Sequence, residues 1–308
     1  MKAVIIDAYK SLSAVRVGEI PKPQVKRGDV LVQVKAASVN SGDERIRSLN
    51  FKGLPVPAWS IRPIMHIMLG FRKPRKTLGV ALSGVIESIG DDVTNLKVGD
   101  EIYAMTGTRF GAFAEYALLS ADHCITIKPT NASFLQAAAL PFGGTTALSF
   151  LHKANVQDAK HVLICGSTGA VGVAAVQIAK HFGAVVSVIC GPDGITLSKN
   201  IGADHVYDYT KTTIDEIEGT FDVVFDTVGQ TPKRQCTKIL SEHGRHVSTM
   251  SMDSAKELTA DLETIKELYE SGAIVDVIDS VYKLEDALKA FQRVGTGQKN
   301  GSVVLEIK

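Results

Sequence analysis

The sequence predicts a protein of two domains, a doubly wound α/β domain with a parallel sheet and a β-rich barrel domain. Three observations predict this fold class. Residues 1–125 read as short strands between turns, residues 126–272 alternate strands with helices, and the chain closes on a further strand. A length of 308 residues suits two domains. We therefore expect residues 1–125 and 273–308 to form the barrel domain, and residues 126–272 to form the α/β domain.

Short apolar runs predict the strands of the barrel domain. Asp29–Ala37 alternates, with Val30, Val32 and Val34 on one face. Four more runs between turn signals are expected to be strands: Lys2–Asp7, Gly84–Ile89, Glu101–Ala104 and Ala112–Leu118. Because this part of the chain shows no long helical pattern, it favours a barrel-like sheet.

The α/β domain is expected to begin with a helix. Ser133 and Gln136 have the spacing of a capping box, which predicts a helix up to Pro141, and a second helical pattern runs from Thr146 to Lys153. Strands are then expected at His161–Cys165, Val185–Cys190, Phe221–Asp226 and Arg245–Thr249, with helices at Val173–His181 and through Leu197. Such alternation is typical of a parallel sheet covered on both faces.

The last part of the chain adds two helical patterns and a strand. Asp261–Ser271 is amphipathic, Leu284–Val294 reads as a helix, and Gly301–Ile307 reads as a closing strand. We expect this strand to return to the barrel domain.

Composition excludes several classes of partner. The formal net charge is +1, from 34 basic and 33 acidic residues, so neither nucleic acid nor an anionic membrane is expected as a bulk partner. The N-terminus has no signal-peptide pattern, and the apolar stretches stop short of the ~18 residues of a transmembrane segment. The four cysteines lie far apart, without C-x-x-C spacing, so no disulfide framework or structural zinc site is visible. We expect a cytoplasmic protein.

The most informative motif joins an apolar strand to a helix through a glycine-rich turn. After Cys165 the chain continues with Gly166, Ser167, Thr168, Gly169, Ala170, Val171 and Gly172. Glycine permits the tight turn, lets the backbone approach a pyrophosphate and allows the helix to pack closely on the strand. The helix N-terminus offers free N–H groups and partial positive charge to phosphates. The spacing differs from the usual G-x-G-x-x-G, but the strand–turn–helix context predicts a dinucleotide site.

The residues after the second strand bear on the choice of nicotinamide cofactor. An NAD site usually places Asp or Glu about 20 residues after the fingerprint, where it bonds the ribose hydroxyls. Here the strand ends in Cys190 and Gly191, which leaves room for the 2′-phosphate of NADPH. Asp193 follows two residues later, and a carboxylate facing the phosphate would favour NADH instead. We expect Asp193 to point outward and NADPH (NADP) to be preferred over NAD.

Motifs along nearly the whole chain occur in the order of one family. They are Val39-Asn40-x-x-Asp43, Gly84–Gly90, Val98-Gly99-Asp100, Gly111–Tyr116, Leu140-Pro141, Thr146-Ala147 and Gly202–Val206. Together they resemble the medium-chain dehydrogenase/reductase superfamily, and within it the zinc-free, zeta-crystallin-like quinone oxidoreductase branch. The resemblance implies a Rossmann cofactor domain inserted in a GroES-like barrel domain, with the active site in the cleft between them.

The resemblance also addresses the metal and the reaction. Zinc-dependent relatives carry Cys where this chain has Asn40, and a His-Glu pair where it has Val80 and Ala81, so no metal is expected. Without a Lewis acid, hydride transfer to an already electrophilic acceptor is favoured. A quinone or an enone (α,β-unsaturated carbonyl) is such a small, hydrophobic acceptor.

Two alternatives remain open. One is a zinc-free alcohol or aldehyde oxidoreductase, and the other is a low-turnover NADPH-binding protein with a redox-sensing or structural role. An open cleft at Asn40 and Thr146 would favour an enzyme, whereas a cleft plugged by the segment after residue 60 would favour a binding protein.

The resemblance assigns roles residue by residue. Asn40, Asp43 and Thr146 would line the nicotinamide end of the cleft as catalytic residues. The cofactor would be held by Gly166, Ser167, Thr168, Gly169, Ala170, Val171, Gly172, Cys190, Gly191, Lys199, Tyr209, Thr227, Val228, Gly229, Lys299 and Asn300. From the residues alone, Asn40 and Asp43 could instead satisfy turn backbone, and Lys199 could be a surface lysine.

The chain departs from the family pattern in two places, and one stretch is unusual. Arg45 stands where some quinone reductases carry Tyr, which argues against a Tyr proton donor. Residues 249–259 are shorter than the strand and helix that usually pair two cofactor domains, which leaves a homodimer open. The basic and apolar stretch at 61–76 is expected to be a loop: a lid over the acceptor, a membrane contact, or a segment packed on the barrel.

Overall fold

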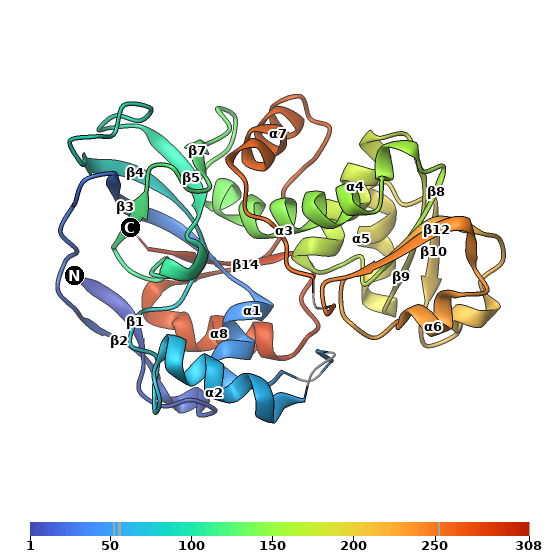
Figure 1. Ribbon diagram of the computed structural model, residues 1–308, viewed down its shortest axis with the longest axis horizontal. Helices are drawn as coiled ribbons and strands as arrows, with labels where there is room; N and C mark the ends of the chain where they lie inside the picture. Colours follow the sequence, from blue (N-terminus) through green and yellow to red (C-terminus); the bar gives the residue numbers. More distant parts are fainter. Residues whose placement is uncertain (52, 55–56, 252, 308) are drawn as a thin grey trace.

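The computed structural model describes residues 1–51, 53–54, 57–251 and 253–307. They form two lobes, each with its own sheet, and the long helix α3 (Phe134–Lys153) runs between them (Figure 1).

The α/β lobe contains a five-stranded sheet in which every neighbouring pair is parallel. In spatial order the strands are β10 (His205–Asp208), β9 (Val185–Cys190), β8 (His161–Cys165), β11 (Phe221–Asp226) and β12 (Leu240–Ser248). The helices of this lobe are α4 (Ala170–His181), α5 (Ile195–Asn200) and the short α6 (Lys233–Cys236). The predicted α/β class is confirmed. The strand order reverses between β8 and β11, and such a switch point is where open α/β sheets bind ligands.

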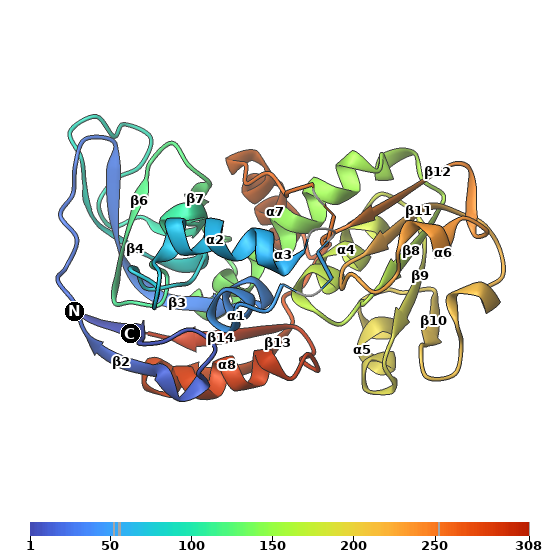
Figure 2. The same cartoon turned by 60° about the horizontal axis from the view of Figure 1, so that its bottom comes forward.

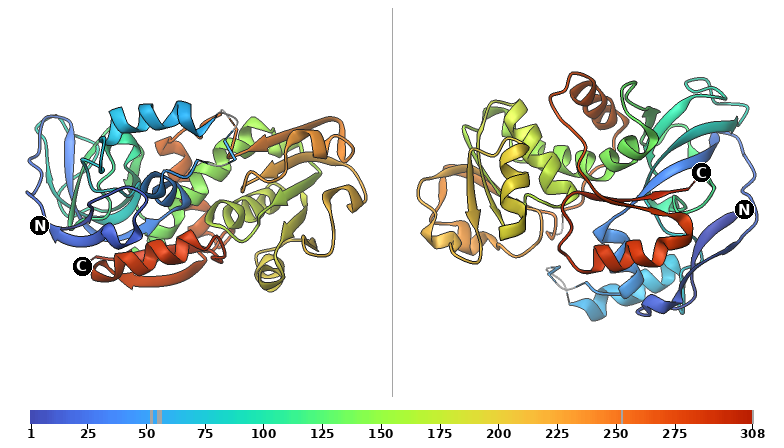
Figure 3. Two further views of the ribbon diagram at one scale, coloured as in Figure 1. Left: turned by 90° about the horizontal axis from the view of Figure 1, so that it is seen from below. Right: turned by 180° about the vertical axis from the view of Figure 1, so that it is seen from behind.

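The barrel lobe holds a seven-stranded sheet and a two-stranded one. The larger sheet runs β13 (Ile278–Lys283), β14 (Ser302–Glu306), β3 (Asp29–Val39), β4 (Ala81–Ile89), β5 (Glu101–Met105) and β7 (Ile125–Ile127), with β6 (Tyr116–Ser120) beside β3. The smaller sheet pairs β1 (Lys2–Ile6) with β2 (Val15–Glu19). These strands cover or overlap every predicted run. β14 pairs with β3, so the closing strand does return to the barrel, and both chain ends lie on this lobe (Figure 3). The chosen domain boundaries stay predictions.

Two helices in the first part of the chain correct the expectation that it has none. They are α1 (Ser41–Ser48) and α2 (Ala58–Leu69), which lies along the outside of the barrel lobe (Figure 2). α2 covers residues 61–69, more than half of the stretch expected to be a loop. Two features hide this helix in the sequence. Pro63 lies inside it, and Trp59 and Ile67 are 76% and 78% exposed, so its apolar residues mark no single buried face.

α3 also differs from the prediction, because it is continuous where a break was expected at Pro141. Its small residues allow close contact with two other helices. A Cβ on Gly143 would lie 2.4 Å from the Ala170 carbonyl oxygen of α4, and one on Gly144 would lie 2.5 Å from Ile265 Cδ1. Ile265 belongs to α7 (Thr259–Glu270). Packing on both sides therefore stabilises the helix despite its proline and glycines.

The length of α3 also corrects the expectation that every apolar stretch is shorter than a transmembrane segment. Among the described residues it is the one helix long and apolar enough to span a membrane, and 72% of its most apolar window is buried inside the protein. Its core cluster joins Tyr103 of β5 and Leu148 of α3 to Val162 of β8. α3 is thus packed as a core helix shared by both lobes. The remaining helix, α8 (Ala287–Gly295), packs against β13 and β14.

Candidate functional site

The glycine turn between β8 and α4 has the geometry that the sequence predicts. Gly166 has φ +87°, and a Cβ there would lie 2.6 Å from Val228 Cγ1. A Cβ on Gly172 would lie 2.0 Å from the Gly166 carbonyl oxygen. These two glycines are therefore required by the turn and by the approach of α4 to it.

Gly169 is different, because its missing side chain would meet no described residue beyond its chain neighbours. It is the N-cap of α4 with φ −74° and ψ 166°, and no side chain caps the helix there. Apart from the two adjacent residues, no atom of the described part of the chain lies within 4 Å of the position that its Cβ would take. The space beside the N-terminus of α4 is therefore open at Gly169, as expected of a site for an anion.

The C-terminal segment supplies a buried cation beside this turn. The Gly301 N–H donates to the Thr168 carbonyl at 2.7 Å, which places residues 299–301 next to the turn. The Lys299 ammonium is buried and donates to the Gly301 carbonyl at 2.7 Å. Burial lowers the pKa of Lys299 to about 8. The adjacent Asn300 N–H donates to Asp279. A buried cation with one neutral acceptor fits a pyrophosphate bound at the turn.

The structure also brings together part of the predicted adenosine end. The Tyr209 N–H donates to the Cys190 carbonyl at 3.1 Å, and a Cβ on Gly191 would lie 3.0 Å from the Tyr209 hydroxyl. Lys199 is exposed on α5, and Asp193 is exposed as well. Ser167 is buried with its hydroxyl 2.7 Å from that of Ser198, so only its backbone can face a ligand.

The end of β11 forms the opposite wall of the turn. The Thr227 hydroxyl donates to the carbonyls of Cys165 and Gly166, at 2.9 Å each, so it fastens β11 to β8. Buried Asp226 accepts the N–H groups of Val228, Gly229 and Thr231 and thereby shapes the following turn. Val228 remains 45% exposed beside Gly166. This leaves an apolar side chain facing the place predicted for the nicotinamide.

Asn40 and Asp43 organise the start of α1. The Asp43 carboxylate accepts the N–H of Asn40 at 2.9 Å and the N–H of Gly79 at 3.1 Å, so it ties α1 to the segment before β4. Burial raises the pKa of Asp43 to about 7. The Asn40 amide donates to the carbonyl and hydroxyl oxygens of Ser38. Both side chains therefore form hydrogen bonds with backbone groups. Asp43 also lines a cavity.

A cavity of about 260 Å³ lies between α1 and α3. It is lined by Gly42, Asp43, Ile46, Val80, Met105, Phe142, Thr145, Thr146, Ala255 and Glu257. Of the three predicted catalytic residues, Asp43 and Thr146 meet here and Asn40 does not. No described residue bonds the Thr146 hydroxyl, whereas Thr145 donates to the Pro141 carbonyl at 2.8 Å. Among the described residues that line this cavity, none comes from α2.

A larger cavity of about 690 Å³ adjoins the first one. The two share Val80, Ala255 and Glu257. Glu257 Oε2 lies 3.2 Å from His123 Nε2 of the barrel lobe. Glu257 and Ala255 are not among the predicted site residues, because they belong to the shortened segment that follows β12. The sequence shows that this segment is short, but it does not show that the segment runs over α3.

Comparison with known proteins identifies the chain. The family "alcohol dehydrogenase GroES-like domain" matches residues 26–129, and the family "zinc-binding dehydrogenase" matches residues 170–293. A 2-methylene-furan-3-one reductase of Solanum lycopersicum is 32% identical over 99% of this chain and 79% of its own length. The chain belongs to the medium-chain dehydrogenase/reductase superfamily. A chloroplastic NADPH-dependent alkenal/one oxidoreductase of Arabidopsis thaliana is 29% identical, with the same coverage. The structure of the quinone oxidoreductase of Coxiella burnetii matches with a TM-score of 0.89 and 26% identity, covering 100% of this chain and 99% of that one.

Membership confirms the predicted fold, a Rossmann domain with a GroES-like barrel, and places this oxidoreductase in the quinone oxidoreductase branch. Val80 lines the cavity at the position where, by the resemblance described above, zinc-dependent members carry a His. Among the described residues no group of three His, Cys, Asp or Glu side chains could hold a metal ion.

Arg45, the other departure from the superfamily pattern, lies at the junction of the lobes. Its guanidinium contacts Met250 Sδ, and burial lowers the pKa of Arg45. A Cβ on Gly53 would lie 3.3 Å from Met250 Cε. The segment after α1 therefore reaches the end of β12 across the cleft.

Proposed function

We propose that this oxidoreductase uses NADPH to reduce quinones or α,β-unsaturated carbonyls, without zinc. The observation that carries the proposal is the cavity between α1 and α3, which is lined mainly by apolar side chains and presents Val80 where a metal ligand would stand. The reactions for which the relatives are named support the same reaction class. The alcohol or aldehyde oxidoreductase is less favoured, because an unactivated carbonyl needs stronger polarisation than this lining offers.

The residues present fit a nicotinamide dinucleotide. The α4 N-terminus and Lys299 would hold its pyrophosphate, and the nicotinamide, when bound, would supply the hydride. Val228 and the Thr146 hydroxyl would orient the reacting ring and acceptor, since the hydroxyl has no described partner. Ile46, Val80 and Phe142 would exclude water and hold a planar, apolar acceptor in place.

The preference for NADPH rests on the adenosine end. Residue 191 is a glycine rather than an acidic residue, and Asp193 is exposed. Lys199 lies on α5, and Tyr209 directly follows β10. A 2′-phosphate there would gain a cation and a hydroxyl donor. A cytoplasmic location and the oligomeric state stay predictions.

Turnover with NADPH and NADH is the direct test. We expect 1,4-benzoquinone and an enal to be reduced with NADPH at an efficiency at least ~10-fold above NADH, which corresponds to about 1.4 kcal/mol. A chelator should change nothing. Chelator-sensitive oxidation of an alcohol would overturn the proposal, and tight NADPH binding without turnover would favour the binding-protein alternative.

A substitution in the cavity tests where the acceptor binds. Val80→Trp is expected to raise KM for the quinone at least ~10-fold and to leave NADPH affinity within about twofold. The reason is that the indole would fill the acceptor cavity and not the cofactor site. Val98→Trp is the matched control, since Val98 is 58% exposed. An unchanged KM for Val80→Trp would show that the acceptor binds elsewhere.

A further inference from the structure

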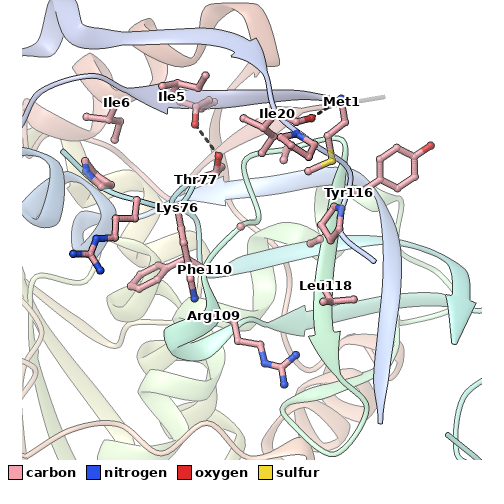
Figure 4. A pocket seen from close by; sticks show the side chains of 18 of the residues that line it. Met1, Ile5, Ile6, Ile20, Lys76, Thr77, Arg109, Phe110, Tyr116 and Leu118 are labelled. Atoms are coloured by element: carbon pink, nitrogen blue, oxygen red, sulfur yellow. Dashed lines mark hydrogen bonds between the residues drawn. The ribbon is translucent and has the colours of Figure 1, made fainter. Parts of the chain in front are cut away.

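A third cavity, of about 910 Å³, opens in the barrel lobe, beside the N-terminal strand β1 (Figure 4). Five segments form its walls: β1, β2, and residues 20–29, 73–77 and 109–118. It shares Arg109 and Phe110 with the 690 Å³ cavity but no lining residue with the acceptor cavity. None of its residues belongs to the proposed cofactor site. Small-molecule sites in proteins measure about 300 to 1,000 Å³, so this cavity is large enough for a ligand.

The charge of the lining is strongly one-sided. It includes six basic residues, namely Arg16, Lys26, Lys73, Arg75, Lys76 and Arg109. The one acidic residue, Asp29, accepts from Arg109 at 2.7 Å. Asp7, outside the lining, pairs with Arg16 and Lys73. The side chains of Lys26, Arg75 and Lys76 bond to no described residue, although the chain as a whole carries a net charge of only +1. Such an excess of unpaired cations attracts an anion.

Apolar side chains occupy the rest of the lining. In Figure 4, Lys76 and Arg109 lie toward one end of the cavity, while Met1, Ile20 and Tyr116 lie toward the other. Phe110 lies between Lys76 and Arg109, and Leu118 lies on the same side of the cavity as Tyr116. An inorganic anion would leave this apolar surface in water, and a neutral lipid would leave the cations unpaired. The lining matches a molecule that has one anionic end and an apolar body.

We propose that this cavity binds a soluble anionic amphiphile, with its phosphate or carboxylate at Arg75 and Lys76 and its apolar chain toward Ile20 and Leu118. The proposal does not depend on the proposed reaction, since no residue is shared with the acceptor cavity.

Calorimetric titration of the full chain with monomeric dodecyl phosphate tests the site. We expect saturable binding of one molecule, with affinity at least ~10-fold lower for the Arg75→Ala/Lys76→Ala variant. Arg234→Ala/Lys238→Ala removes two exposed cations of the α/β lobe and is the charge-matched control, which should bind as the wild type does. Leu118→Trp, which fills the apolar part, should also weaken binding by at least ~10-fold while NADPH affinity stays unchanged.

Two probes separate the contributions of the two ends. Dodecanol lacks the charge and inorganic phosphate lacks the chain, and each is expected to bind at least ~10-fold more weakly than dodecyl phosphate. Equal affinity of the wild type and the Arg75→Ala/Lys76→Ala variant, or dodecanol binding as tightly as dodecyl phosphate, would overturn the proposal. Competition by saturating NADPH would do so as well, because it would place the ligand in the cofactor site.

Discussion

Replacing Gly169 by aspartate is expected to remove tight NADPH binding while leaving the fold intact. The backbone at Gly169 already has the extended conformation of an N-cap, with φ −74° and ψ 166°, and its Cβ position is open. Aspartate is among the best N-cap residues, so stability should stay the same or rise by up to about 1 kcal/mol. The carboxylate would stand where the pyrophosphate is proposed to bind. Two such charges ~4 Å apart repel by roughly 4 kcal/mol near a protein surface, which is at least a 100-fold loss of affinity.

Thermal unfolding and NADPH titration together distinguish this effect from damage to the fold. Gly172→Ala is the contrasting variant, because its Cβ would lie 2.0 Å from the Gly166 carbonyl oxygen. It should lose both stability and binding. If Gly169→Asp bound NADPH as the wild type does, the pyrophosphate would not lie at this turn.

The parts of the molecule that could be predicted from sequence are those fixed by local patterns. The strand, turn and helix around Gly166 and Gly172 follow from apolar runs and from glycines that tolerate close approach. β9 and β11 begin and end where predicted, because buried parallel strands are continuous apolar runs bounded by turns.

The features that were missed depend on tertiary contacts. α3 continues through Pro141 because α4 and α7 pack against Gly143 and Gly144, and no local signal reports that packing. The cavity residue Glu257 comes from a segment without regular pattern, whose place is set by contacts with the barrel such as that with His123. The same holds for the basic cavity beside β1, which five separate segments of the chain build.

Asp43 is expected to make stability depend on pH in a way that an asparagine variant would not. Burial raises the pKa of Asp43 from 3.8 to about 7 in the folded chain. Between these values the folded chain holds a proton that the unfolded chain releases, so this contribution to stability is complete below pH about 4 and is lost as pH rises to about 7. From pH 5 to pH 8 the wild type should therefore lose about 3 kcal/mol that Asp43→Asn does not lose. Urea unfolding of both proteins at the two pH values measures the difference.

The pH dependence of the free energy of unfolding must be compared between the wild type and Asp43→Asn, because other groups titrate in the same pH range. Asp91→Asn removes an exposed carboxylate of the barrel lobe and should keep the wild-type slope. Asp43→Asn leaves one of two backbone N–H groups, that of Asn40 or that of Gly79, without an acceptor, so it should also lower stability at pH 8 by about 1–3 kcal/mol. Equal slopes for the wild type and Asp43→Asn would mean that solvent reaches this carboxylate. The tie between α1 and the segment before β4 would then be looser than the buried geometry indicates, and the acceptor cavity that it borders would be correspondingly more adaptable.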